Sequence, residues 1–174
     1  MTDKVRSKYK FFGGFGLLLV MNLFIGILLC YILVISKISI DKVDLINNSD
    51  ARFSYIALLG AQLLLLLFFL GENKYIIADA DGITFINPLF PFLIKTKTWD
   101  SYDYFITVDE KSKYSTHEAV WLIKDEKISN RFSSFCYSNY DEIKEQIKTN
   151  GKGKQYYNSF GQLFALLRIK KIKN

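Results

Sequence analysis

The side chains that could carry out catalysis are few and scattered along this 174-residue chain. His117 is the only histidine, so a serine or cysteine nucleophile that depends on imidazole would have to use it. Ser133, Ser134 and Cys136 are the candidates along the chain, but no nucleophile motif surrounds them. We therefore expect no catalytic residues and no enzyme activity.

The remaining acidic and sulfur-containing side chains give no alternative chemistry. The carboxylates that could form pairs fall in predicted turns, where solvated charge is expected; they are Asp109, Glu110, Asp125 and Glu126. Cys30 lies in an apolar run and Cys136 in a strand-like run, with no metal-ligand spacing and no disulfide framework around them. The sequence predicts no metal and no cofactor.

Apolar and charged residues are segregated along the chain. Residues 11–35 contain no charge, and as a helix they would span roughly 37 Å, more than the ~30 Å hydrocarbon core of a bilayer. Residues 53–70 are also uncharged and would span about 27 Å. We predict transmembrane helices over 11–35 and 53–71, joined by a connector over 36–52. A cleaved signal peptide is disfavoured because the first run is too long and lacks a small-residue cleavage site.

Two amides and a group of small residues stand out within the predicted spans. Asn22 and Gln62 are the only amides there, and because an amide facing lipid is unfavourable we expect both to point inward and to pair. Ala57 and Ala61 form a face on which a second helix can approach closely. Two explanations stay open for that face, namely packing inside the hairpin and association with another membrane protein or a second copy.

The basic residues predict an orientation and a partner. Four Lys/Arg lie in the basic tail over residues 1–10 and three in the connector, and the denser side is expected in the cytoplasm. Both termini and the following domain are therefore predicted to be cytoplasmic, on a two-pass integral protein of the inner or plasma membrane. The net charge of +6 is too dispersed for nucleic-acid binding, so anionic lipid is the expected partner of this excess.

In residues 72–150 the pattern changes to short runs in which apolar and polar residues alternate. Such runs are typical of half-buried antiparallel strands. A turn over 79–82 predicts an opening hairpin, and Asn139, with Glu142 three positions later, predicts a capped helix that ends near Asn150. The predicted strands lie within 74–78, 83–87, 95–99, 102–108, 119–123 and 128–137. The fold class is thus a membrane α-helical hairpin plus an α+β domain that is mostly antiparallel β.

This order of elements resembles the pleckstrin-homology-like fold, in the bacterial versions found on small membrane proteins. The resemblance covers about residues 73–149 and is carried by the opening hairpin through Ala80-Asp81-Gly82, by Thr98-Trp99-Asp100, and by the run 135–142 that leads into the helix. It implies a bent sheet or barrel closed by a C-terminal helix, and a binding or scaffolding role. Inositide binding at the first hairpin is not expected, because that turn is acidic.

Residues 151–174 are predicted to form a linker followed by a short basic amphipathic helix. The segment from Ser159 places large apolar side chains at helical spacing, with basic residues at its end. The residues of this proposed surface are Phe160, Leu163, Phe164, Leu167, Arg168, Lys170, Lys171 and Lys173. The helix has three possible places, which are the membrane surface, the domain and a partner protein.

Two functions remain open from the sequence. The first is a non-enzymatic membrane protein that presents a cytosolic binding or scaffolding domain to a protein partner or to the anionic membrane surface. The second is an accessory subunit that a larger membrane complex holds through the transmembrane hairpin. They differ in which part of the chain binds the partner, the domain in the first and the helices in the second.

Overall fold

The structure is a computed structural model that describes residues 4–38, 49–111 and 115–172. The chain divides into two compact units. One unit comprises residues 16–71, and the other combines residues 1–15 with residues 72–174. Residues 4–15 therefore belong to the folded domain, and the described part of the predicted tail over residues 1–10 is not separate from that domain.

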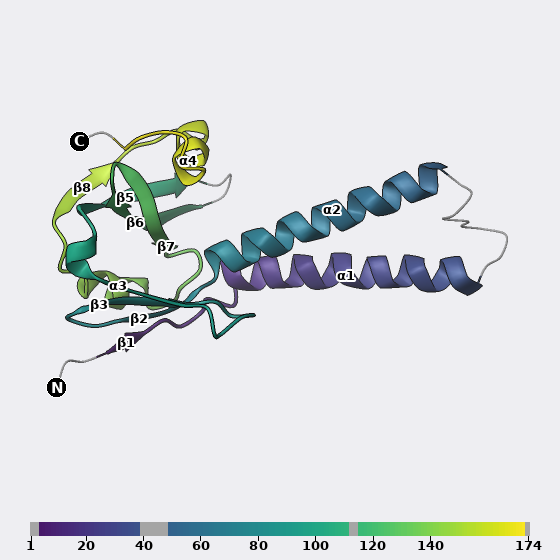
Figure 1. Ribbon diagram of the computed structural model, residues 1–174, viewed down its shortest axis with the longest axis horizontal. Coiled ribbons are helices and arrows are strands. Elements are labelled where there is room, and N and C mark those ends of the chain that lie inside the picture. The colour runs from purple at the N-terminus through teal and green to yellow at the C-terminus, as the bar shows by residue number, and fades with distance from the viewer. Residues whose placement is uncertain (1–3, 39–48, 112–114, 173–174) are drawn as a thin grey trace. The chain divides into compact units, whose positions relative to one another are not determined.

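Two long helices, α1 (Gly14–Ile38) and α2 (Ser49–Glu72), form the first unit and run side by side in Figure 1. Both are long and apolar enough to cross a membrane. α1 begins three residues later than predicted, and α2 begins four residues earlier, at Ser49. Helix boundaries predicted from sequence are commonly wrong by about two to four residues, so the prediction of two apolar helices agrees with the structure in type and in position.

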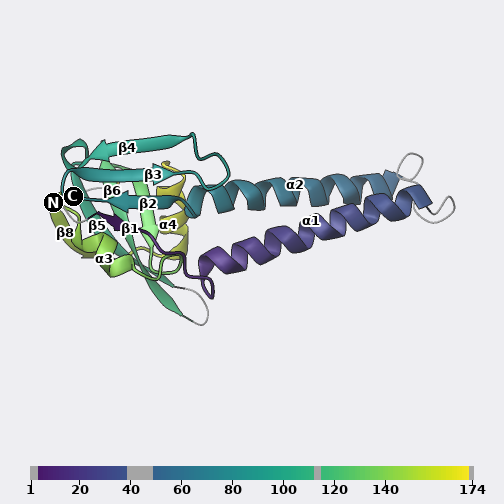
Figure 2. The ribbon, with the colours of Figure 1, turned by 90° about the horizontal axis from the view of Figure 1, so that it is seen from below.

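The domain contains two four-stranded sheets. The first has the order β1-β2-β3-β4, all antiparallel, in which β2, β3 and β4 form a meander and β1 joins from the start of the chain (Figure 2). Its strands are β1 (Val5–Arg6), β2 (Tyr75–Ala78), β3 (Gly82–Ile86) and β4 (Ile94–Thr98). β4 is an edge strand with most of its residues exposed.

The second sheet has the order β7-β6-β5-β8, in which β8 runs parallel to β5 and the other pairs are antiparallel. Its strands are β5 (Tyr104–Lys111), β6 (Thr116–Lys124), β7 (Lys127–Ser133) and β8 (Gly151–Gln155). A 3-10 turn, η1 (Trp99–Ser101), leads from the first sheet to the second. Two helices complete the domain, α3 (Tyr140–Glu145) and α4 (Ser159–Leu166).

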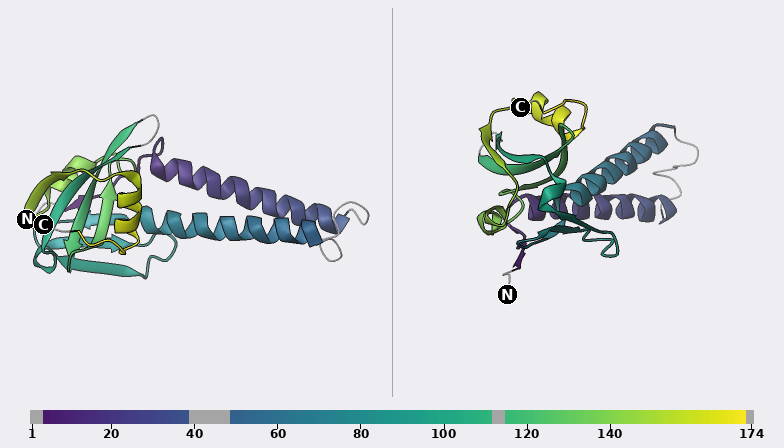
Figure 3. Two further views of the ribbon diagram at one scale, coloured as in Figure 1. Left: turned by 90° about the horizontal axis from the view of Figure 1, so that it is seen from above. Right: turned by 60° about the vertical axis from the view of Figure 1, so that its left-hand side comes forward.

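The second sheet packs against a core on each face, which explains the continuous apolar run Ala119–Ile123 in β6. On β6, Val120 and Leu122 point into a core shared with the first sheet and α3. Trp121 and Ile123 point to the opposite face, into a second core that includes residues of α4 and the C-terminal segment. Figure 3 shows α4, in yellow, against this sheet. The α4 segment is thus part of the domain.

Four details differ from the predictions. Residues 151–154 do not form a flexible linker, since β8 occupies them. α3 ends at Glu145, several residues before Asn150. Asn139 precedes α3, but its side chain makes no capping bond because it is used by the N-terminal segment. The strands form two separate sheets, and a closed barrel is not shown.

Candidate functional site

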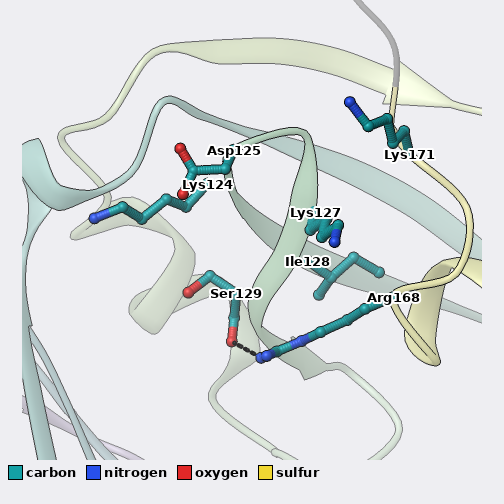
Figure 4. A pocket seen from close by; sticks show the side chains of 7 residues that line it. All are labelled: Lys124, Asp125, Lys127, Ile128, Ser129, Arg168 and Lys171. Carbon is teal, nitrogen blue, oxygen red and sulfur yellow. Dashed lines mark hydrogen bonds between the residues drawn. The ribbon is translucent and has the colours of Figure 1, made fainter.

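A basic groove lies where the β6–β7 turn meets the chain after α4. The pocket has a volume of about 420 Å³, and Figure 4 shows its seven lining side chains. They are Lys124, Asp125, Lys127, Ile128, Ser129, Arg168 and Lys171. Four of the seven are cationic and one is acidic, so the groove favours a negatively charged group.

The turn at one side of the groove places two lysines opposite each other. Asp125 and Glu126 both adopt positive φ, at 52° and 58°, which is the backbone of a two-residue hairpin turn with the twist that antiparallel strands need. The register then pairs Lys124 with Lys127 across the hairpin. Like charges directly opposite each other on a sheet are destabilising, so a bound anion would relieve repulsion here.

The other side of the groove is fixed by contacts to the same strand and turn. Arg168 Nη2 donates a hydrogen bond to the Ser129 carbonyl oxygen at 3.2 Å, drawn as the dashed line in Figure 4. Lys97, from β4, donates from Nζ to Ser129 Oγ at 2.6 Å. Lys171 Nζ lies 2.7 Å from Glu126 Oε2 at the surface. Arg168 and Lys97 therefore converge on one residue of β7.

Burial and the other cations near Ser129 lower the pKa of Lys97. The pKa of Lys97 is lowered, first by burial and then by the nearby charges of Lys95, Lys124 and Arg168. These neighbouring cations come from both sheets and from the chain after α4. Such a concentration is what an anionic surface or ligand would compensate.

α4 packs on the domain through its small residues and leaves its large ones exposed. Gly161 and Ala165, one helical turn apart, are buried. The large apolar residues stay exposed, with Phe160 exposed to 72%; the others are Leu163, Phe164 and Leu167. Asn158 caps the helix by accepting a hydrogen bond from Gly161 N at 2.7 Å. An apolar face therefore remains open beside the basic groove.

The basic residues predicted for this segment have different roles. Arg168 lines the groove, Lys170 Nζ lies 5.3 Å from the centre of the Tyr157 ring, and Lys171 is ion-paired with Glu126. Lys173 lies outside the described residues. The structure thus places Arg168 and Lys171 together at the groove and turns Lys170 toward Tyr157.

A second exposed apolar group lies on the loop that joins β3 to β4, which extends past the ends of both strands in Figure 2. Asn87 holds the loop by accepting hydrogen bonds at Oδ1 from Leu89 N and Phe90 N, at 3.0 and 3.1 Å. The exposed side chains are Leu89, Phe90, Phe92, Leu93 and Ile94. Because the loop is held by its own hydrogen bonds, these side chains form a defined surface.

In the helical unit, the two amides lie together. Gln62 Nε2 donates to Asn22 Oδ1 at 3.2 Å, and Asn22 Nδ2 donates to the Leu18 carbonyl oxygen at 2.8 Å. Ala57 and Ala61 are exposed on α2. The structure therefore brings the amides to the contact between α1 and α2 and leaves the alanine face outside it.

The structure shows the surroundings of Cys136 and His117, two of the residues considered for catalysis. Burial raises the pKa of the Cys136 thiol to about 12, so the reactive thiolate is scarce at neutral pH. His117 Nε2 lies 2.9 Å from Ser115 Oγ, and its ring lies against Phe135. Within residues 4–38, 49–111 and 115–172, no group of three His, Cys, Asp or Glu side chains could hold a metal ion.

A buried ion cluster was not foreseen from the sequence. Arg131 pairs with Glu72 and donates from Nε to Glu110 Oε1 at 2.8 Å. Burial alone would lower the pKa of Arg131, but the two carboxylates raise it above its usual value. Every charged group in the cluster is bonded to another member of it. We therefore interpret the cluster as one that stabilises the fold. The partners lie 21 and 59 positions from Arg131, which no local pattern reveals.

The chain consists of a pair of long apolar helices and an antiparallel-rich sheet domain with a C-terminal helix. Comparison with protein-family models, characterised proteins and solved structures found no match.

Proposed function

We propose that this chain is a non-enzymatic, two-pass membrane protein whose cytosolic domain binds the anionic surface of the bilayer. The observation that carries the proposal is the face of α4, where large apolar side chains stay exposed beside the basic groove. Apolar side chains that enter the lipid interface, with cations beside them at the headgroups, are the two parts of interfacial membrane binding.

A second feature supports the same function. The loop over residues 87–94 exposes further large apolar side chains, including Phe92 at 76%. Contiguous exposed apolar groups of this kind mark interaction sites on proteins. We propose that both apolar groups serve one binding platform on a pleckstrin-homology-like domain. The two meanders, β2-β3-β4 and β5-β6-β7, followed by α3, support that finer fold assignment.

The test uses the full chain in lipid nanodiscs, because a fragment that starts at residue 72 would lack β1. A polarity-sensitive bimane label is placed at Phe164→Cys in a Cys30→Ala background, where the buried Cys136 thiol stays unlabelled. In nanodiscs with phosphatidylglycerol, nitroxide-bearing lipids should quench this label, and raised salt should reduce the quenching.

The control carries the same label at Glu145→Cys, an exposed position on α3, where quenching should be weak. Equal quenching at both positions, or quenching at position 164 that does not depend on anionic lipid, would contradict the proposal. Phosphatidylcholine alone should give the weaker signal because it carries no net charge.

The second candidate is an accessory subunit of a larger membrane complex. It is favoured by the exposure of Ala57 and Ala61, since small residues on a helix in lipid allow another helix to approach closely. The double variant Ala57→Leu, Ala61→Leu should then release a membrane protein or second copy that copurifies in mild detergent. Leu63→Phe, at another exposed position on α2, should not.

A further inference from the structure

A pocket separate from the basic groove opens between the edge strand β4 and the second sheet. It has a volume of about 360 Å³, near the lower end of the range typical of small-molecule sites. Its lining residues are Lys74, Phe85, Asn87, Leu93, Ile94, Lys95 and Asn130. All of them belong to the folded domain.

The walls of this pocket are apolar. Phe85 is buried beneath it, and Leu93 and Ile94 form its exposed side. Leu93 N donates to the Phe90 carbonyl oxygen at 2.8 Å and Asn87 N to the Leu93 carbonyl oxygen at 3.4 Å, so the loop that supplies this wall is held in place. An alkyl chain is the kind of group such walls accept.

The polar groups of the pocket are mainly donors. Asn130 is only 5% exposed, and because its Oδ1 accepts from Tyr102 Oη at 3.0 Å, its Nδ2 group is the donor that it can offer to the pocket. Lys74 and Lys95 add two ammonium groups. An amide donor beside two cations favours an acceptor with negative charge.

The charge balance around Lys74 leads to the same conclusion. Its pKa is lowered, first by burial, with Lys95 and Arg168 adding to the effect, while Glu72 opposes it. Glu72 is bonded to Arg131 and does not line the pocket. The ammonium groups at the pocket therefore have no carboxylate of their own among the residues that line it.

We propose that this pocket binds a fatty carboxylate, with the alkyl chain against Phe85, Leu93 and Ile94. The carboxylate accepts from Lys74, Lys95 and the Nδ2 group of Asn130. A carboxylate has two oxygens with about four acceptor positions, enough for these three donors. The small volume fits a single chain better than a two-chain phospholipid.

The experiment labels the full chain, in phosphatidylcholine nanodiscs, with a dodecanoate that carries a terminal diazirine. After illumination, the labelled residues are identified by mass spectrometry. Labelling should concentrate on Phe85, Leu93 and Ile94, and unlabelled dodecanoate should compete whereas dodecanol should not. Labelling of α1 and α2 by probe dissolved in the bilayer serves as the internal reference.

Variants distinguish binding of the probe in a specific pocket from its simple partition into the bilayer. The double variant Lys74→Met, Lys95→Met should reduce labelling of the pocket about tenfold relative to the helices, as loss of a charge-assisted hydrogen bond predicts. Ile94→Trp, which fills the pocket from its exposed side, should do the same without removing a charge. Lys148→Met, on the exposed segment after α3, should change nothing.

Three results would overturn the proposal. The first is equal labelling by the carboxylate probe and by the corresponding alcohol probe. The second is labelling that all three variants leave unchanged. The third is stronger competition by dodecyl phosphate than by dodecanoate, which would assign the site to a phosphate group. The phosphatidylcholine nanodiscs lack the anionic surface that the proposed function requires, so the outcome does not depend on whether α4 and the loop over residues 87–94 bind such a surface.

Discussion

Arg131 supplies the positive charge that compensates two partly buried carboxylates of the domain. It lies between Glu72, at the end of α2, and Glu110 on β5, and Ser133 Oγ also donates to Glu110 at 3.2 Å. A buried ion pair gives little net stability compared with apolar packing, but removal of one member leaves a buried charge without compensation. The cluster is therefore a sensitive point for stability.

We predict that Arg131→Met destabilises the domain by about 3–5 kcal/mol, because two carboxylates would then repel each other in a buried site. The measurement is urea unfolding in mild detergent, followed by tryptophan fluorescence. Trp99 and Trp121 are the only tryptophans, and both are buried in the domain, so the signal reports the domain alone. Lys148→Met is the matched control.

Recovery of stability when Glu72→Gln and Glu110→Gln are added to Arg131→Met would assign the loss to the unpaired charges. If the single variant unfolds at the same urea concentration as the unaltered chain, the ion cluster is not buried as described.

Glu118 gives the domain a dependence on pH. Its Oε1 accepts hydrogen bonds from Tyr140 Oη at 2.9 Å and from Lys144 Nζ at 2.6 Å. Burial alone would raise the pKa of Glu118, but these two bonds lower it below the ordinary value of 4.5. A carboxyl group with a lowered pKa in the folded state stabilises that state above its unfolded pKa, and the stability is lost as pH falls through the folded pKa.

Glu118→Gln should therefore reduce stability by about 1 kcal/mol at neutral pH, since the charged acceptor is lost and the site is partly exposed. The difference between the two proteins should shrink as pH falls below 4.5. Urea unfolding at several pH values measures it. A difference that stays constant from neutral to acid pH would contradict the role of the carboxylate.

At the scale of the elements, β1 depends on a residue more than a hundred positions away. Asn139 Oδ1 accepts from Lys8 N at 2.7 Å, and its Nδ2 donates to the Arg6 carbonyl oxygen at 2.9 Å. Ser7 is also bonded to β2, since its Oγ accepts from Ile76 N at 2.8 Å. Side chains therefore reinforce the backbone pairing of this two-residue strand with β2.

We predict that Asn139→Ala accelerates amide hydrogen exchange in residues 4–10 while the exchange of β5 and β6 stays slow. The reason is that Lys8 N loses its acceptor and the strand is too short to persist alone. Exchange followed by mass spectrometry gives the rates. Asn150→Ala, at an exposed amide beside β8, is the control, and faster exchange in that variant too would refute a specific role for Asn139.

The sequence predicted the central elements because their signals are local. Alternation places the second sheet correctly, since Val120 and Leu122 face one core while Trp121 and Ile123 face the other. β1 was missed although Val5, Ser7 and Tyr9 alternate with exposed basic residues, because the same lysines and arginine fit the flank of a transmembrane helix. Its strand character depends on pairing with β2, more than sixty positions away.

β8 and the basic groove show what such local signals omit. Glycine is rare in strands, yet a Cβ atom added at Gly151 would lie 2.8 Å from the Phe105 ring, so a larger residue there would displace that ring. Arg168 was expected at a surface, but Lys97 and Ser129 join it from strands of different sheets. The groove is a product of the tertiary structure, and no spacing in the sequence encodes it.

At the scale of the whole molecule, β1 constrains the topology of the chain. Val5 pairs with Ala78 and Arg6 with Ile77, so the segment before α1 and the segment after α2 fold together. If both helices cross a bilayer, the two segments must emerge on the same side. The denser positive charge of the first ten residues then favours the cytoplasm for that side.

We predict that a membrane-impermeant maleimide labels Ser49→Cys in intact cells, whereas Lys8→Cys and Lys148→Cys react only after permeabilisation. The background is Cys30→Ala, and the buried Cys136 does not react. Labelling of Lys8→Cys and Lys148→Cys from outside would reverse the orientation but keep the hairpin. Different accessibility at positions 8 and 148 would contradict the pairing of β1 with β2, because one folded domain cannot lie on both sides of a membrane.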